Sequence, residues 1–527
     1  GQEGGVDQPR LAIAVVESEP LVEIIRNRHG GAGYPAAPRL GQTGRVDAAT
    51  TPVGLPAGLR DELLAILGDR GLHVDAVDLA LHAGDSSLLR GRAGAVCFPA
   101  SALEVAAVVG AAHRHGHPVV ARGAGTGLAG GAVPLDDALV VVTTRLNEIE
   151  EIDVANRVAW VQPGVINLDL DREVRPMGWH FAPDPSSQQA CTIGGNVATN
   201  SGGPHCLAYG ITNAHVVAVE VVLGDGEPVV LGGLDPEPIG LDLRGAFVGS
   251  EGTFGIATRI AVRLTRTPRA VATLLVDFTS AGDAADAVSA IISAGIVPAA
   301  LEMMDGAITR AAEAFVHAGY PTDAEAVLLV EVDGLPDGVE TTVDAVEAIL
   351  RRHGCRTVRR AGDEAERALL WKGRKTAFGA VARIMPNYYL HDTVIPRRHL
   401  AAMLQRVAEI ASDHDVSIMN VFHAGDGNLH PLVVFDAREP GILERVHAAG
   451  DDIVRASIGF GGVLSGEHGI GLEKREFMPL MFSDADLDAQ DRLRRSFDPD
   501  GRLNPAKVLP SGSRCGDIRE LPVGTWI

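Results

Sequence analysis

The sequence contains few of the features that mark a disulfide-rich or membrane-spanning protein. Its five cysteines are odd in number, widely spaced and include no C-x-x-C pair. This spacing argues against a disulfide framework and excludes an iron–sulfur ferredoxin module in this chain. No apolar run approaches the roughly 20 residues that cross a bilayer. The run Leu11–Val16 is also too short, and lacks the basic flank, for a signal peptide.

Basic residues are scarce relative to acidic ones. The chain has 46 Lys and Arg against 68 Asp and Glu, for a formal net charge of -22. Nucleic acids and anionic membranes need basic surface, so neither is expected as a direct partner. A protein this acidic would have to hold phosphate groups largely with backbone N–H groups. The cysteine usage favours a reducing compartment, so we expect a cytoplasmic location, with peripheral association with the membrane left open.

Glycine, by contrast, is abundant, and it concentrates in a stretch from Pro183 to Gly203 that contains no Lys or Arg. Small residues let a backbone approach a ligand closely, and consecutive N–H groups can form a nest for anions. Ile193, Val197 and Ala198 supply spaced apolar anchors that a disordered linker would not need. The stretch predicts a cradle for a large phosphate-bearing cofactor. A glycine-rich surface crossover is the alternative that this stretch alone leaves open.

A second glycine-rich loop, Gly123–Gly131, follows the predicted strand 118–122. It contains G-x-G-x-x-G at Gly125–Gly130, the spacing of a Rossmann fingerprint. That fingerprint must open a helix of about ten or more residues. Here Pro134 and the predicted strand 138–143 follow at once, so no such helix fits. We therefore interpret the loop as a glycine nest at the end of a strand.

The rest of the chain predicts a mixed α+β architecture. A third glycine-rich segment, Gly245–Gly255, precedes the predicted strand 256–264. Beyond residue 270, predicted strands 272–278 and 327–332 alternate with predicted helices 282–293 and 339–353. This alternation favours an antiparallel sheet with helices on one face. A further helix is expected over 492–497.

Two histidines in Phe422–His430 suggest a metal site. A hairpin that turns through residues 425–428 would bring His423 and His430 together, and paired imidazoles suit Zn, Mn or Fe(II). The alternative is two histidines satisfied by ordinary hydrogen bonds. Glu467 could complete a two-His, one-carboxylate site, and His468 beside it could then act as a general base.

A basic segment, Trp371–Thr376, offers a further candidate. Arg374 or Lys372 could clamp a substrate carboxylate, Arg374 in bidentate fashion. The alternative is a solvated basic helix face.

Together these motifs, in this order, resemble the FAD-linked 2-hydroxyacid dehydrogenases of the vanillyl-alcohol oxidase and p-cresol methylhydroxylase superfamily. This group includes D-lactate dehydrogenase, the catalytic subunit of glycolate oxidase and D-2-hydroxyglutarate dehydrogenase. The resemblance runs from about residue 60 to about residue 510. It implies catalytic roles for His468, Arg374 and Asn428, and metal binding by His423, His430 and Glu467. The FAD-binding positions that it implies are Arg122, Gly123, Ala124, Gly125, Thr126, Gly127, Pro183, Asp184, Ser186, Gly194, Gly195, Asn196, Ala198, Thr199, Asn200, Gly202, Gly203, Glu251, Gly252, Gly255, Ile256 and Asn504.

The fold implied by the resemblance is a p-cresol methylhydroxylase-type FAD-binding domain of two α+β subdomains, plus an α+β substrate (cap) domain with a largely antiparallel sheet. The expected divisions are a peripheral or partly disordered segment 1–54, the FAD-binding domain 55–269, the cap domain 270–490, a C-terminal segment 491–512 that returns to the FAD domain, and a tail 513–527.

The implied activity is oxidation of a D-2-hydroxy acid to the 2-oxo acid, with metal-assisted proton abstraction and hydride transfer to flavin N5. The first glycine loop lacks the histidine that often carries a covalent flavin in this superfamily, so noncovalent FAD is expected. Zinc is the favoured metal, with manganese or iron as alternatives. Leu390 stands where the resemblance would place a lysine of D-2-hydroxyglutarate dehydrogenases, which favours D-lactate or glycolate over a dicarboxylate.

Several partners and alternatives stay open at this point. The electron acceptor could be a quinone, a cytochrome or an electron-transfer flavoprotein, and an iron–sulfur partner subunit and a homodimer are both compatible with the resemblance. The alternative functions are D-2-hydroxyglutarate dehydrogenase and an electron-relaying flavoprotein subunit of a glycolate-oxidase-like complex. The superfamily also contains alkyl-dihydroxyacetonephosphate synthase and an NADPH-dependent flavin reductase of cell-wall synthesis, but neither explains His423, His430 and Glu467.

Overall fold

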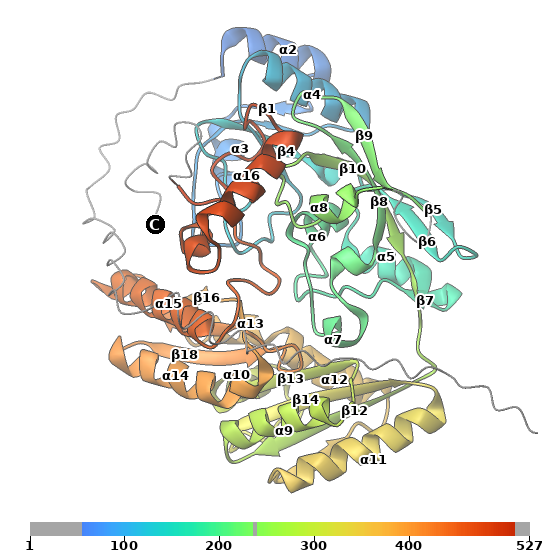
Figure 1. The fold of residues 1–527 in the computed structure, drawn as a ribbon, viewed down its shortest axis with the longest axis vertical. Coiled ribbons are helices and arrows are strands. Elements are labelled where there is room, and N and C mark those ends of the chain that lie inside the picture. Colours follow the sequence, from blue (N-terminus) through green and yellow to red (C-terminus); the bar gives the residue numbers. More distant parts are fainter. Residues whose placement is uncertain (1–54, 235–239, 512–527) are drawn as a thin grey trace, which may run out of the picture. The chain divides into compact units, whose positions relative to one another are not determined.

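A computed structural model describes residues 55–234 and 240–511 (Figure 1). The expected N-terminal segment 1–54 and the tail 513–527 lie outside the described residues.

The first part of the predicted FAD-binding region is a four-stranded sheet with strand order β1-β2-β4-β3. Strands β2, β4 and β3 run parallel, and β1 pairs antiparallel at the edge. Helices α2 and α4 pack on this sheet through Leu59, Leu63 and Val105, which are fully buried. Ser101 caps α4 by accepting the N–H of Glu104. The elements are α2 (Ala57–Leu67), β1 (Leu72–His73), α3 (Ala76–Leu81), β2 (Ala93–Cys97), α4 (Ala102–Arg114), β3 (Val119–Arg122) and β4 (Ala138–Val142).

The second part is a five-stranded antiparallel sheet with order β5-β6-β10-β8-β9. Its core includes Val161, Val219 and Ile260. One helix, α6, forms inside the glycine-rich stretch, which the sequence predicts only as a cradle; Thr192 caps it by accepting the N–H of Gly195. The elements are β5 (Ile149–Asp153), β6 (Val158–Val161), α5 (Asn167–Val174), β7 (Trp179–His180), α6 (Ile193–Thr199), α7 (Cys206–Tyr209), β8 (Val216–Val222), β9 (Pro228–Gly232), α8 (Leu243–Phe247), β10 (Ile256–Arg263) and β11 (Thr265–Arg266).

The cap region is a seven-stranded sheet with order β15-β12-β14-β13-β18-β20-β16, and every pairing is antiparallel. The strands are β12 (Ala270–Phe278), β13 (Ala300–Asp305), β14 (Ala326–Gly334), β15 (Thr357–Arg360), β16 (Asn387–Leu390), β18 (Ser417–Phe422) and β20 (Pro431–Phe435). A short pair, β17 (Thr393–Val394) with β19 (Asn428–Leu429), lies at its end.

The expectation of helices on one face of this sheet is wrong, because helices cover both faces. Leu274 and Val276 of β12 pack in a core with α9, α11, α14 and α15. Leu275, between them, packs in a separate core with α10, α12 and α13. Successive side chains of a strand point to opposite faces, so a run of apolar residues needs cover on both sides. The helices are α9 (Ala281–Ser293), α10 (Gly306–Val316), α11 (Pro336–Arg352), α12 (Glu364–Lys375), α13 (Ala377–Val381), α14 (Leu400–Asp413) and α15 (Ile442–Gly459).

The C-terminal segment packs on the FAD-binding sheets. Helix α16 (Asp484–Phe497) begins eight residues before the predicted start, because Ser483 and Asp486 form a capping box. Phe497 stacks on Phe254 at 4.6 Å between ring centroids. Leu503 then joins the core beneath β3.

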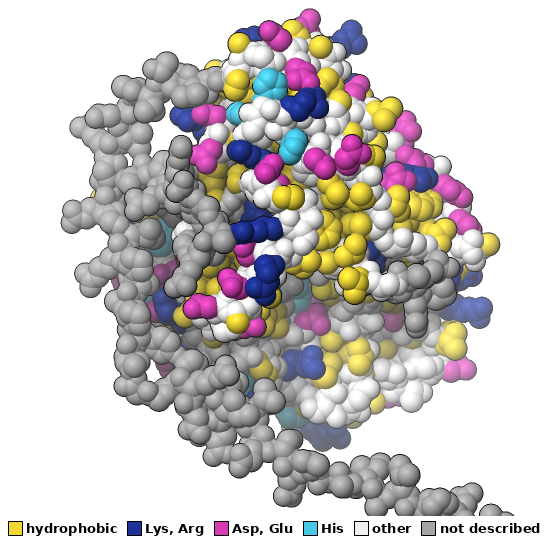
Figure 2. All heavy atoms as spheres, turned by 45° about the horizontal axis from the view of Figure 1, so that its top comes forward, with side chains coloured by type: hydrophobic (Ala, Val, Ile, Leu, Met, Phe, Trp, Pro, Cys, Tyr) yellow, Lys and Arg dark blue, Asp and Glu magenta, His cyan; other side chains and the backbone are white. Residues whose placement is uncertain are grey.

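Charges of both signs are mixed on the face shown in Figure 2, where Lys and Arg side chains lie scattered among Asp and Glu. Within residues 55–234 and 240–511, no helix has the length and apolar character needed to cross a membrane.

Candidate active site

The predicted pair of histidines meets where β18 leads into β20. The imidazole rings of His423 and His430 lie 5.1 Å apart between centroids and are nearly perpendicular. A backbone bridge between His423 and Asn428 closes the turn, and Gly427 adopts a φ of +73° there, which suits glycine. Both histidines are at least 97% buried, so this is an interior cluster rather than a surface one.

Glu467 completes the cluster. Its Oε1 lies 3.1 Å from Nε2 of His423 and 3.0 Å from Nε2 of His430. Two ligand atoms each about 2.1 Å from a metal lie roughly 3.0–3.4 Å apart at octahedral or tetrahedral angles. These two distances lie within that range, and the three donor atoms all lie within 4.8 Å of one another, so the cluster could hold one divalent cation. Nitrogen and carboxylate ligands suit zinc, manganese or iron(II).

Charge in the cluster also favours a cation. Burial alone would lower the pKa of His423, but the carboxylates of Glu302 and Glu467 raise it to about 10. Glu302 lies behind His423, with both carboxylate oxygens 2.9 Å from Nδ1. The pairing of β13 with β18 puts these residues opposite each other. A carboxylate behind Nδ1 orients the ring so that Nε2 faces the ligand position, as is usual for metal-bound histidine.

Arg374 lies one layer further out, on α12. Its Nη2 is 2.6 Å from Oε2 of Glu302, and its side chain is 1% exposed. The alternative of a solvated basic face is therefore wrong for Arg374, whereas Lys372 is exposed. Nε and Nη1 of the buried guanidinium have no hydrogen-bond acceptor among the described residues. Such unsatisfied buried donors could hydrogen-bond an acceptor on a ligand.

His468 stacks on His430, with ring planes 9° apart and centroids 5.1 Å apart. Burial lowers the pKa of His468 to about 4, so its imidazole is neutral at neutral pH. Asn428 is also buried, beside the loop that carries His468, and its Oδ1 has no partner among the described residues. The structure thus gathers the predicted general base and Asn428 at the histidine cluster.

The first predicted flavin loop follows β3. No backbone N–H from Gly123 to Gly131 donates a hydrogen bond to another described residue. Such a row of free amides at a strand end is a ready site for phosphate oxygens. Arg122 turns its Nη1 to the carbonyl of Gly84, and burial lowers its pKa. These amides and the small residues between them fit a pyrophosphate-bearing cofactor.

The glycine-rich stretch lies against the histidine cluster. A Cβ on Gly202 would lie 2.9 Å from Oε2 of Glu467, so a side chain there would meet the carboxylate. Helix α6 carries Gly194, Gly195, Asn196, Ala198 and Thr199, and Asn200 caps its C-terminus in the left-handed conformation.

Three predicted flavin positions at the start of this stretch face other groups. The carboxylate of Asp184 pairs with His205 at 2.9 Å and with Lys375 at 3.2 Å. Pro183 offers its carbonyl to Asn167, and Ser186 is exposed.

The third loop connects both regions. The carboxylate of Glu251 accepts the N–H groups of Ile470 and Gly471, just beyond His468. Asn504 donates from Nδ2 to the carbonyls of Gly131 and Glu251, so the C-terminal motif ties the first and third loops together. Gly252 and Gly255 take positive φ in this loop, and Ile256 begins β10.

Sequence reasoning missed two buried carboxylates, Glu302 and Asp392, and the interdomain histidine His205. Asp392 holds the loop that carries Glu467, and His205 joins Asp184 to Glu331 of β14. Their partners lie far away in the chain, so no local pattern marks them.

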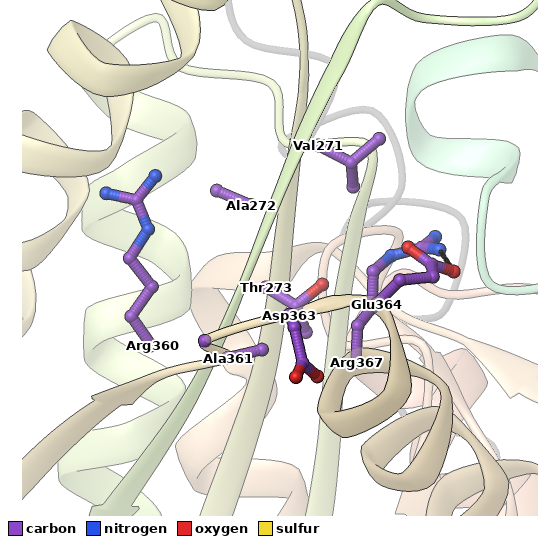
Figure 3. A pocket seen from close by; sticks show the side chains of 9 residues that line it. Val271, Ala272, Thr273, Arg360, Ala361, Asp363, Glu364 and Arg367 are labelled. Carbon is purple, nitrogen blue, oxygen red and sulfur yellow. Dashed lines mark hydrogen bonds and ion pairs between the residues drawn. The ribbon is translucent and has the colours of Figure 1, made fainter.

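A cavity of about 480 Å³ opens on the cap sheet, between β12, β15 and the start of α12 (Figure 3). Arg360 stands on one side, with Glu364 and Arg367 on the other. Both arginines are paired, Arg360 with Glu340 and Arg367 with Glu331. The residues that line it include none of the predicted site residues.

Comparison with known proteins defines the class. Residues 93–232 match the family model described as "FAD binding domain", and residues 267–508 match "FAD linked oxidases, C-terminal domain". The chain belongs to the FAD-linked oxidase family: it is an FAD-dependent oxidoreductase, and the predicted family is confirmed.

Among curated proteins, the chain is 45% identical to the glycolate oxidase subunit GlcD of Escherichia coli K12, over 86% of this chain and 91% of that protein. It is 40% identical to GlcD of Bacillus subtilis over 80% of this chain and 90% of that protein. It is 32% identical to D-lactate dehydrogenase of Anaerostipes hadrus over 77% and 87%.

Solved structures confirm the predicted fold class. p-Cresol methylhydroxylase superposes with a TM-score of 0.74 at 16% identity, covering 88% of this chain and 99% of that chain. 4-Ethylphenol oxidase from Gulosibacter chungangensis superposes with a TM-score of 0.72 at 19% identity, with the same coverage.

Proposed function

We propose that this protein oxidises a D-2-hydroxy acid, D-lactate or glycolate in preference, to the 2-oxo acid at a site that holds FAD and a divalent metal. The observation that carries the proposal is the position of the cluster formed by His423, His430, Glu467 and His468. It lies against the flavin stretch at Gly202, where a substrate could meet base, metal and flavin together. The glycolate oxidase subunits and D-lactate dehydrogenases among its relatives support this substrate class.

The metal and the flavin would each have a defined task. His423, His430 and Glu467 would hold the metal, which when bound supplies Lewis-acid chemistry at the substrate hydroxyl. The glycine loops would hold FAD noncovalently, and FAD when bound supplies the two-electron acceptor.

The protein's own groups handle the proton and the orientation of the substrate. A neutral His468 can accept the hydroxyl proton on an imidazole nitrogen, because its pKa lies below neutral pH. The free donors Nε and Nη1 of Arg374 would bind the substrate carboxylate, with Glu302 fixing the guanidinium.

Leu390 supports a monocarboxylate substrate. It occupies the end of β16, where it is 8% exposed and joins an apolar core. An apolar side chain at this position supplies no cation for a second carboxylate.

The direct test is anaerobic reduction of the flavin by a panel of D- and L-lactate, glycolate and D-2-hydroxyglutarate, together with metal analysis. We expect D-lactate or glycolate to bleach the flavin fastest, and a chelator to abolish bleaching. If D-2-hydroxyglutarate bleached the flavin fastest, it would replace D-lactate and glycolate as the proposed substrate. Full activity without metal would refute the role of the cluster.

A further inference from the structure

The loop Ser465–Gly471 carries the proposed metal ligand Glu467 and the proposed base His468, yet it contains neither helix nor strand. Each backbone N–H from residue 466 to residue 471 donates to a side-chain oxygen. Backbone amides of a part-buried loop need acceptors, so the residues that supply these oxygens determine where the loop lies.

Asp392 supplies the first anchor. One carboxylate oxygen, Oδ2, accepts the N–H groups of residues 466, 467 and 468 at 2.9, 3.1 and 2.9 Å. The same oxygen accepts the hydroxyl of Ser465 at 2.5 Å, and that hydroxyl accepts the N–H of Gly469 at 3.0 Å. Asp392 is fully buried and follows β16, so this anchor belongs to the cap region.

Glu251 supplies the second anchor, from the flavin side. Its Oε1 accepts the N–H of Ile470 at 2.7 Å, and its Oε2 accepts the N–H of Gly471 at 2.8 Å. The backbone of Glu251 binds the other flavin segments: its N–H donates to the carbonyl of Ala198 at 2.8 Å, and its carbonyl accepts Nδ2 of Asn504 at 2.6 Å.

The backbone of Glu251 is itself constrained. It adopts a φ of +53°, which is unfavourable for a residue with a side chain. Such a conformation persists only where the surrounding structure enforces it. Anything that orders the flavin loops therefore also orders the carboxylate that holds the loop Ser465–Gly471.

We propose that Glu251 is a positioning residue that couples FAD binding to the order of the loop Ser465–Gly471, while Asp392 holds this loop to the cap region whether or not FAD is bound. The significance of the loop rests on the proposed function of Glu467 and His468, but the coupling itself does not. FAD that restrains the backbone at Ala198 and Glu251 restrains the loop through two hydrogen bonds to one carboxylate.

Hydrogen exchange of the full-length chain, with FAD bound and with FAD removed, tests this coupling. In the wild type we expect FAD to slow exchange of the amides of residues 466–471 by about fivefold or more, the usual scale of coupling between sites. In Glu251→Gln the side-chain volume stays, but the new NH₂ group cannot accept the second amide. The slowing by FAD should then be lost in this loop, while FAD still slows exchange in the loop 123–131.

Two further variants separate coupling from general stability. Asp392→Asn should speed exchange of the loop in both flavin states and leave the ratio between them unchanged. Asp277→Asn is the matched control, because Asp277 is a buried carboxylate that accepts the N–H of Thr357 at 2.9 Å on strands away from the loop. It should leave both the exchange of the loop and its dependence on FAD as in the wild type.

Equal slowing in the wild type and in Glu251→Gln, or no slowing in the wild type, would overturn the coupling. Flavin reduction tests the proposed function separately. A wild type that FAD protects but that no 2-hydroxy acid reduces would retain the coupling and refute the function. A wild type whose flavin is reduced by a 2-hydroxy acid, but whose loop FAD does not protect, would retain the function and refute the coupling.

Discussion

The flavin loops and the histidine cluster lie against each other at Gly202 and Glu467, but different chemical groups make up each of them. The loop Gly123–Gly131 presents backbone N–H groups and small residues. The cluster presents side chains that hold one another: Arg374 contacts Glu302, Glu302 contacts His423, and His423 contacts Glu467.

This difference determines how each region can fail. In a site built of backbone groups, a substitution leaves the N–H in place, because every residue except proline offers one. Such a site is therefore damaged mainly by the added volume of a side chain. A site built of side chains fails when one functional group is removed, since its neighbours then lose their partner in a buried environment. The predictions below test this contrast.

The largest effect on activity should come from removing His468, the proposed general base. His468→Asn should retain FAD but slow flavin reduction by about 10²–10⁴-fold, the usual contribution of general base catalysis. Anaerobic stopped-flow spectroscopy measures it. His113→Asn, a partly exposed position on α4, is the control and should reduce at the wild-type rate. Rapid bleaching of the flavin in His468→Asn would refute the assignment.

Metal binding should show a graded loss across the cluster. Glu467→Gln removes a proposed ligand, and we expect the purified variant to contain little or no metal. Glu302→Gln removes the carboxylate behind His423, which also pairs with Arg374, and zinc affinity should fall by about 10–100-fold. Competition with a chelator measures both variants, and FAD content should be unchanged in each. A larger loss in Glu302→Gln than in Glu467→Gln would reverse the assigned roles.

Added volume should damage the flavin region. Gly203 has a φ of +148°, and a Cβ there would lie 2.6 Å from the backbone carbonyl of Asp184. Gly203→Ala should therefore be purified with severalfold less FAD. Gly295 also has a positive φ, but a Cβ there would meet nothing within 4 Å. Gly295→Ala should cost only roughly 1–2 kcal/mol of stability and keep its FAD. Equal FAD content in both variants would refute a role for Gly203 in FAD binding.

The smallest effect concerns His205, which joins Asp184 of the glycine-rich stretch to Glu331 of the cap sheet. Burial alone would lower the pKa of His205, but the carboxylates of Asp184 and Glu331 raise it to about 10. A raised pKa in the folded state stabilises the protein fully below the unfolded value near 6.5, and this stabilisation is lost as pH rises towards 10. The difference in melting temperature between the wild type and His205→Gln should therefore shrink from pH 6.5 to pH 10. A constant difference would mean that His205 is not charged.

Local patterns predicted many elements of this fold. The strands β10, β12 and β14 and the helices α9 and α11 lie close to the expected ranges, since periodicity and capping act between near neighbours in the chain. The sequence also excludes a Rossmann helix after Gly125–Gly130 for a local reason: a helix needs a minimum length of chain, and Pro134 follows too soon.

Other features depended on distant contacts. Helices cover both faces of the cap sheet because β12 and β14 are apolar on both sides, whereas the order of strands and helices along the chain does not specify the face on which each helix packs. Ser483 and Asp486 start α16 earlier than its apolar pattern suggested.

The sequence alone thus predicted the glycine nests and a turn that brings His423 close to His430, because each depends on residues close together in the chain, and its resemblance to a known family implied FAD. Only the tertiary structure decided which buried carboxylates contact these residues. The pairing of β13 with β18 brings Glu302 to His423, and the pairing of β17 with β19 brings Asp392 beside His430 and the loop that carries Glu467. These carboxylates become partners of the site through strand register, which no local pattern of residues specifies.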